Sequence, residues 1–144
     1  MKNPLRFLFW PHPKKKLLLQ ALFWVAFIRL GLCIFQFRRL NKWLGGSKSE
    51  DVRESDWKII REIAEFVRLG SRFVPQATCL TQALAARTLL RRMGQNSLLK
   101  IGVDKDTDFK LVAHAWIEID GKIIIGKVPD IRRYAIMSHN TRQY

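Results

Sequence analysis

Hydrophobic residues recur every three or four positions in two stretches, residues 60–67 and 79–93, and this spacing predicts two amphipathic helices. The first helix is expected to begin near Ser49, where a cap is followed by two acidic residues, and to end at Gly70. Thr78 is placed to cap the second helix at its first residue. Both helices are expected to contribute their apolar faces to a core.

After residue 94 the hydrophobic period changes from helical spacing to two. The alternation predicts three antiparallel strands, over residues 99–103, 109–119 and 122–128. The dipeptide Asp120-Gly121 favours a type I′ turn, which would pair Ile119 with Lys122 and His114 with Lys127. Helices followed by antiparallel strands indicate an α+β fold, with the helices packed on a small antiparallel sheet.

An apolar run over residues 17–37 precedes this pattern, and a Gly/Ser-containing stretch at 41–50 is expected to be a linker. The run is close to the ~20 residues that span a bilayer, but Arg29 near its middle disfavours a spanning helix. A helix buried against the domain or a partner is favoured, with a helix on an anionic membrane surface as the next alternative. The predicted organisation is a basic N-terminal segment, 1–48, followed by a globular domain, 49–144.

Charge separates the same two parts. The whole chain of 144 residues has a net charge of +14. Most of this charge lies in residues 1–49, which contain ten Lys and Arg residues and no acid. The chain is 48% hydrophobic, which excludes wholesale disorder, and its two cysteines exclude a disulfide scaffold or a four-thiolate zinc site. No nucleic-acid-binding motif accompanies the basic residues, so no nucleic-acid partner is expected.

Cys79 and His114 are the residues whose pattern suggests chemistry. A thiol in the first turn of a helix lies beside unpaired backbone N–H groups, which favour the thiolate and can also donate hydrogen bonds to an oxyanion. His114 lies in the middle of an apolar strand, where an imidazole is held rigidly enough to act as a general base. Cys33 lies inside the apolar run and is interpreted as a packed hydrophobic residue. From these residues alone, a catalytic pair and a structural histidine are equally good interpretations.

Three segments together resemble a known enzyme family: CLTQALAARTLLRRMG from residue 79, LLKIGV from residue 98 and AHAWIEIDG from residue 113. They are similar to the transglutaminase-like cysteine peptidases of lasso-peptide biosynthesis, the stand-alone leader peptidases related to the C-terminal half of the microcin-processing B protein. The resemblance covers roughly residues 50–137. It implies a papain/transglutaminase-like core with a Cys–His–Asp triad, in which Cys79 is the nucleophile and His114 the base.

The third member of this triad is not evident. The family usually has its acid about twelve residues after the histidine, where this chain has Gly126. Asp120 lies too far along the same strand, ~20 Å from His114 at ~3.3 Å per residue. An orienting group must therefore come from near residues 126–130, where Asp130 is the nearest acid, or a backbone carbonyl or water must replace it.

Three further residues could belong to the site. Gln76, three residues before Cys79, could donate to an oxyanion, although a loop glutamine is the favoured interpretation. Trp116 and Glu118 share the face of the strand with the histidine by alternation, and the tryptophan could exclude water or merely pack. The aspartates at 104, 106 and 108 lack the later ligands of a calcium loop, so neither a metal nor a cofactor is expected.

The resemblance implies cleavage of a leader from a ribosomally synthesised precursor peptide. It also implies two partners, a separate leader-binding protein and an asparagine-synthetase-like cyclase, and a cytoplasmic location. Residues 17–37 leave membrane-surface association open. Two alternatives remain: amide transfer or deamidation by the same thiol, and a non-catalytic module that binds a partner or a membrane.

Overall fold

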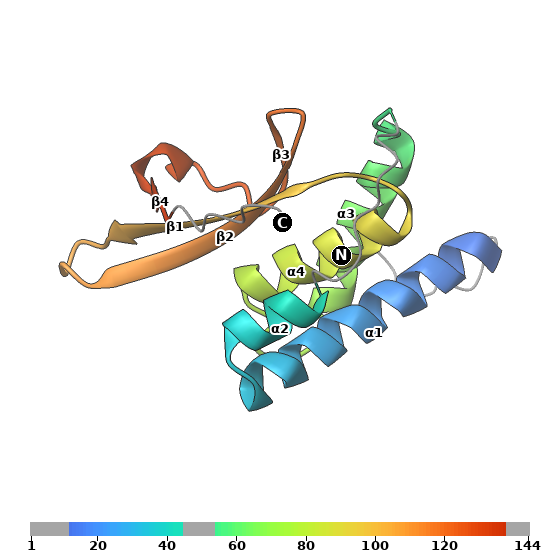
Figure 1. Cartoon of the computed structure of the whole chain (residues 1–144), viewed down its shortest axis with the longest axis horizontal. Coiled ribbons are helices and arrows are strands. Elements are labelled where there is room, and N and C mark those ends of the chain that lie inside the picture. Colours follow the sequence, from blue (N-terminus) through green and yellow to red (C-terminus); the bar gives the residue numbers. More distant parts are fainter. Residues whose placement is uncertain (1–11, 45–53, 138–144) are drawn as a thin grey trace.

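The computed structural model describes residues 12–44 and 54–137, which form four α-helices and one four-stranded sheet (Figure 1). The helices are α1 (His12–Ile34), α2 (Phe37–Leu44), α3 (Trp57–Ser71) and α4 (Cys79–Arg92). The strands are β1 (Leu98–Lys105), β2 (Leu111–Ile119), β3 (Lys122–Ile125) and β4 (Ala135–Ile136), with a 3₁₀ turn, η2 (Ile131–Arg133), before β4. This arrangement confirms the predicted α+β class.

The sheet is antiparallel, with the strand order β3-β2-β1-β4. Asp120 and Gly121 both have positive φ, 48° and 74°, so the hairpin has the predicted type I′ turn and Ile119 pairs with Lys122. Beyond that turn the predicted register is wrong. A bulge shifts the pairing by one residue and β3 ends at Ile125, so His114 has no partner on that strand. The two-residue strand β4 was not predicted.

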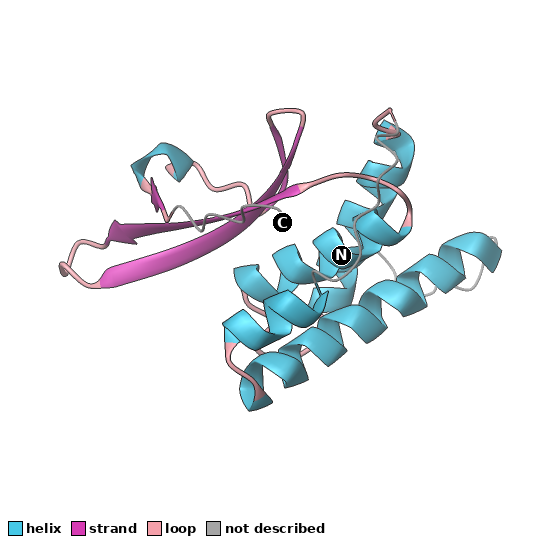
Figure 2. Cartoon of the chain, in the orientation of Figure 1, coloured by secondary structure: helices cyan, strands magenta, loops and turns pink. Residues whose placement is uncertain are grey.

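The helices gather on one side of the sheet, and η2 lies on the other side (Figure 2). Alternation along β2 explains this layering. Ala115, Ile117 and Ile119 are at most 4% exposed and join the core formed with α1, α3 and α4. The intervening residues of β2 face the other side of the sheet, where the chain from β3 to β4 crosses.

Local signals set the ends of α3 and α4. Asp56 caps α3 by accepting from the backbone N–H groups of Lys58 and Ile59, so this helix begins at Trp57 and not near Ser49. The predicted start lies within residues 45–53, outside the described part of the chain. Helix α4 begins at Cys79 and ends before Gly94, whose φ of 72° stops the helix, as predicted.

Helix α1 is a core helix on one side only. Leu17, Ala21 and Val25 belong to the same core as α3 and α4, which supports the favoured interpretation of a helix packed on the domain. The helix stops at Ile34, and α2 then folds back so that Leu40 packs against Gly31. Helical structure continues to residue 44, so the predicted linker is wrong over residues 41–44, and the rest of it lies outside the described residues.

Candidate active site

Cys79 is the first residue of α4, as the sequence predicts. The Thr78 side chain accepts the backbone N–H of Thr81 at 3.4 Å and so caps the helix. The N–H groups of Cys79 and Leu80 belong to the first turn, where no intrahelical acceptor exists. Cys79 is half-buried and packs against the core that α4 shares with the sheet. The thiol thus lies at the positive end of a helix that is fixed by tertiary packing.

His114 lies on β2 opposite Gly102 of β1. Its Nε2 atom is 2.6 Å from the carbonyl oxygen of Gly126. A carbonyl oxygen can only accept, so Nε2 carries the proton and donates it to this bond. In the neutral imidazole the lone pair is then on Nδ1. The Gly126 carbonyl therefore fixes a tautomer in which Nδ1 can act as the base.

Aromatic rings surround the imidazole. The ring of His114 is stacked on Trp116, with centroids 6.2 Å apart, and is tilted against Tyr134 at 5.5 Å. Trp116 is 2% exposed and shares the strand face of His114, as alternation predicted. Tyr134 follows η2 and reaches the site through the crossing segment, so nothing local in the sequence indicated it.

Hydrogen bonds through Glu118 and Lys100 hold the indole of Trp116 in place. Its indole Nε1–H donates to Glu118 Oε1 at 2.8 Å, and Lys100 Nζ lies 2.6 Å from Glu118 Oε2. Burial by itself raises the pKa of Glu118, but hydrogen bonds from Lys100 and Trp116 and the Lys100 charge outweigh it and hold the pKa below its ordinary value. Glu118 therefore stays ionised and locks the indole that packs against His114.

Two glycines allow the crossing segment to lie close to the sheet. A Cβ atom on Gly126 would lie 2.5 Å from the carbonyl oxygen of Ala115, and its φ of 85° is in the left-handed region. A Cβ atom on Gly102 would lie 2.7 Å from the Cβ of Tyr134. The absence of side chains at both positions is what brings Gly126 and Tyr134 against His114.

The two predicted catalytic residues are not joined by a direct hydrogen bond. Within residues 12–44 and 54–137, Cys79 has no hydrogen bond to His114, whose bonding partner is Gly126. Cys79 packs against the core cluster that lies between the helices and the sheet, whereas His114 shares its strand face with Trp116. Proton transfer between the two residues therefore requires their side chains to approach each other when substrate binds.

The carboxylates near the hairpin have other positions. Asp130 precedes η2, and in the described residues its carboxylate makes no hydrogen bond to His114. The group bonded to the imidazole is instead the Gly126 carbonyl, at the residue where the sequence resemblance implies an acid. Asp120 accepts from the Ser55 hydroxyl at 2.7 Å and has no part in this cluster.

Gln76 lies in a tight turn just before α4. The N–H of Ala77 bonds to the carbonyl of Val74, and Gln76 has a φ of 58°, which gives a type II turn after Pro75. Arg29 of α1 donates to Gln76 Oε1 at 2.5 Å. The amide oxygen is therefore occupied, and only the amide NH₂ could serve the predicted oxyanion role.

Arg29 thus connects α1 to the turn before Cys79. The same guanidinium donates to Cys33 Sγ at 2.7 Å, whereas its Nε is buried and has no partner in the described residues. Cys33 itself is exposed, so its interpretation as a packed hydrophobic residue is wrong. The sequence showed Arg29 only as a charge within an apolar run, because its partner at position 76 is distant along the chain.

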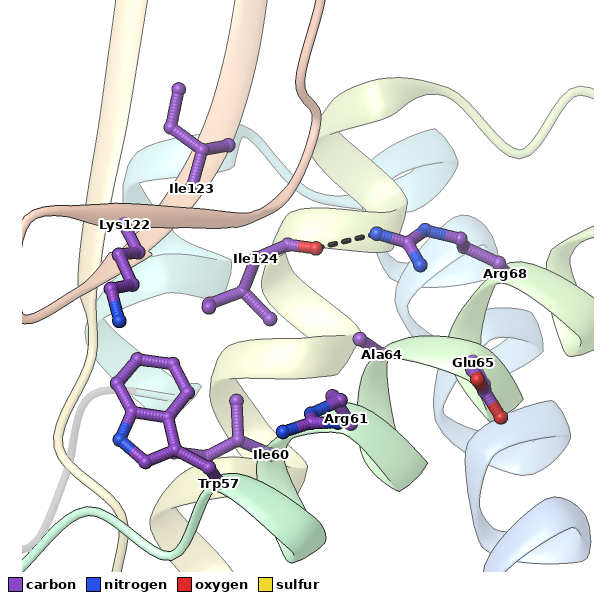
Figure 3. A pocket seen from close by; sticks show the side chains of 9 residues that line it. All are labelled: Trp57, Ile60, Arg61, Ala64, Glu65, Arg68, Lys122, Ile123 and Ile124. Atoms are coloured by element: carbon purple, nitrogen blue, oxygen red, sulfur yellow. Dashed lines mark hydrogen bonds between the residues drawn. The ribbon is translucent and has the colours of Figure 1, made fainter.

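An open cavity of about 640 Å³ lies between α3 and β3 (Figure 3). Lys122 Nζ lies 4.7 Å above the ring of Trp57, and Arg68 donates to the carbonyl of Ile124 at 2.6 Å. Neither Cys79 nor His114 lines this cavity. It is separate from the residues that carry the candidate chemistry.

A comparison with protein families gives one match. The model of the transglutaminase-like superfamily matches residues 23–139, which include about half of α1, both candidate catalytic residues and the whole sheet. No curated protein and no solved structure matches the chain. The match covers well over half of the sequence, and the fold of helices against a small antiparallel sheet agrees with it. This chain belongs to the transglutaminase-like superfamily.

Proposed function

We propose that this protein is a cysteine peptidase that removes the leader from a ribosomally synthesised precursor peptide. The observation that carries the proposal is the bond from His114 Nε2 to the Gly126 carbonyl, because it leaves Nδ1 as the base. The position of Cys79 at the start of α4 supplies the matching nucleophile. The superfamily includes cysteine peptidases, and the sequence resemblance to leader peptidases supplies the substrate class.

In the proposed reaction, Cys79 Sγ attacks the carbonyl carbon at the leader–core junction while its proton passes to His114 Nδ1. This transfer requires Nδ1 and Sγ to lie within hydrogen-bond reach, directly or through one water. The first-turn N–H groups of α4 donate hydrogen bonds to the negatively charged tetrahedral oxygen. Collapse breaks the C–N bond, and the imidazolium gives its proton to the departing amine.

Hydrolysis of the thioester completes the cycle. His114 Nδ1 takes a proton from water, and the resulting hydroxide attacks the acyl carbon of the Cys79 thioester. The C–S bond then breaks, the leader leaves as a carboxylate and the thiol is restored. We further propose that a separate leader-binding protein presents the precursor and that an asparagine-synthetase-like cyclase receives the freed core peptide.

The test is cleavage of a precursor peptide, with its leader-binding protein present, followed by mass spectrometry. Cys79→Ala should abolish cleavage, whereas Cys33→Ala should cleave nearly as fast as the parent. Cleavage by the Cys79→Ala variant would contradict the proposal. A mass shift of the precursor without loss of the leader would instead assign the thiol to deamidation or amide transfer.

A further inference from the structure

Helix α1 has a second apolar face that nothing in the described chain covers. Five large hydrophobic residues on it are 38% to 72% exposed: Leu19, Phe23, Phe27, Leu30 and Ile34. Their spacings of four, four, three and four residues place them within about 80° of arc at about 100° per residue. They form one continuous band along the helix, here called the outer stripe.

The opposite side of α1 is held in the protein core. Its buried residues are Leu17, Ala21, Trp24, Val25 and Ile28. Arg29 also ties the helix to Gln76. Moving α1 into a bilayer as a spanning helix would expose this core face of α3 and α4 and break the Arg29 contact. By length and composition, α1 is long and apolar enough to cross a membrane, but its packing favours a position at the membrane interface.

Helix α2 extends the outer stripe with an aromatic residue and positive charges. The Trp43 ring lies 5.7 Å from Phe27 and is 64% exposed. The neighbouring cations Arg38, Arg39 and Lys42 are also exposed. Tryptophan beside cationic side chains is typical of segments that lie at the boundary between lipid headgroups and acyl chains.

Charge selects the partner for this surface. Lys16 is exposed at the start of the stripe, and the cations of α2 lie at the other end. The first 49 residues contain ten basic residues and no acid, so two copies of this surface would repel each other. An apolar band flanked by cations is complementary to an anionic lipid surface, where each basic residue near the headgroups adds attraction.

We propose that the outer stripe, with Trp43 and the cations of α2, docks this protein on the surface of an anionic lipid bilayer. Helix α1 lies along the membrane plane, with Phe23 and Leu30 inserted at the acyl boundary. The core side of α1 stays packed on the domain. This docking is independent of the peptidase chemistry and needs neither Cys79 nor His114.

The experiment is sedimentation of the full chain with two kinds of vesicles. One contains phosphatidylglycerol and the other phosphatidylcholine alone, each at low and high salt. We expect binding to the anionic vesicles, weakening as salt rises. Phe23→Gln/Leu30→Gln should weaken binding more than about tenfold, because two apolar side chains no longer leave water. Arg38→Gln/Arg39→Gln/Lys42→Gln should remove most of the salt dependence.

The matched control is Phe109→Gln/Leu111→Gln, which removes two apolar residues that are even more exposed (83% and 72%) and lie at the β1–β2 hairpin, outside α1 and α2. It should bind like the parent. Circular dichroism checks that all variants fold. The proposal is overturned by no binding to anionic vesicles or by equal binding to neutral ones. An equal effect of the control, or a protein retained on vesicles after high-salt and carbonate washing, as a spanning helix would be, overturns it too.

Light scattering without lipid tests the other two occupants. The parent should be monomeric, and the Phe23→Gln/Leu30→Gln variant should associate with the leader-binding protein to the same extent as the parent. A concentration-dependent dimer that the parent forms and this variant does not form would assign the stripe to self-association. A complex with the leader-binding protein that only this variant loses would assign it to a protein partner, and either result would overturn the proposal.

Discussion

The two faces of β2 have different compositions and different tasks. On the helix side, Ala115, Ile117 and Ile119 pack in the hydrophobic core. On the other side, His114 and Trp116 lie in a network of hydrogen bonds and ring contacts. Alternation within one nine-residue strand therefore separates residues that hold the fold from residues that position a base. Substitutions on the two faces should separate stability from reactivity.

The largest effect on stability is expected from the core face. Ile117→Ala removes a fully buried side chain and should lower the free energy of unfolding by about 2–5 kcal/mol. Leu111→Ala, on the same strand but 72% exposed, should change it by no more than about 0.5 kcal/mol. Urea unfolding followed by circular dichroism measures both. Equal losses would show that the two positions are packed alike.

Gly126→Ala should affect both stability and activity. The added Cβ would meet the Ala115 carbonyl at 2.5 Å, so the Gly126 carbonyl must move away from His114. We expect a loss of about 1–3 kcal/mol in the free energy of unfolding and a fall of about a hundredfold in precursor cleavage.

Gly121→Ala is the matched control for this change. Its φ of 74° is similar, but nothing lies within 4 Å of the added Cβ, so only backbone strain remains. It should cost about 1 kcal/mol and leave cleavage unchanged. If both variants cleave at the parent rate, the Gly126 carbonyl does not orient the base.

The smallest effect is expected from Glu118→Gln. The folded pKa of Glu118 is lowered, so its carboxylate stabilises the fold above the unfolded value of about 4.3, and this contribution is lost as the pH falls through the folded pKa. The variant should be less stable than the parent at neutral pH by less than about 1 kcal/mol, with the difference vanishing in acid. Denaturation at pH 7 and pH 3 measures it. A difference that does not decrease at all between pH 7 and pH 3 would mean that charge is not the cause.

The helix ends and the hairpin could be predicted because their signals are local. Thr78 and Gly94 bound α4, and Asp120-Gly121 makes the turn, with no need of the rest of the chain. The strand face shared by His114 and Trp116 followed from alternation alone. These features put the two candidate catalytic residues on a helix start and a strand, as expected.

The features that the sequence did not predict depend on contacts between residues that are distant along the chain. The bulge that ends β3 and the approach of Tyr134 over Gly102 follow from how the crossing segment packs on the sheet. The carbonyl of Gly126 has no side-chain signature, so the sequence offered a backbone carbonyl as one alternative to an acid without indicating which carbonyl it is. The sequence did not show which side of α1 packs on the domain. The helix is apolar on both sides, so no polar face marks the side that faces away from the core.

The most direct test of the proposed pair is the alkylation rate of Cys79 between pH 5 and pH 9, measured by mass spectrometry in a Cys33→Ser background. This background leaves one thiol in the chain. If His114 is its base, the parent should be alkylated by iodoacetamide at pH 6 at least about tenfold faster than the His114→Ala variant. Identical pH profiles in the two proteins would show that the imidazole and the thiol do not act together.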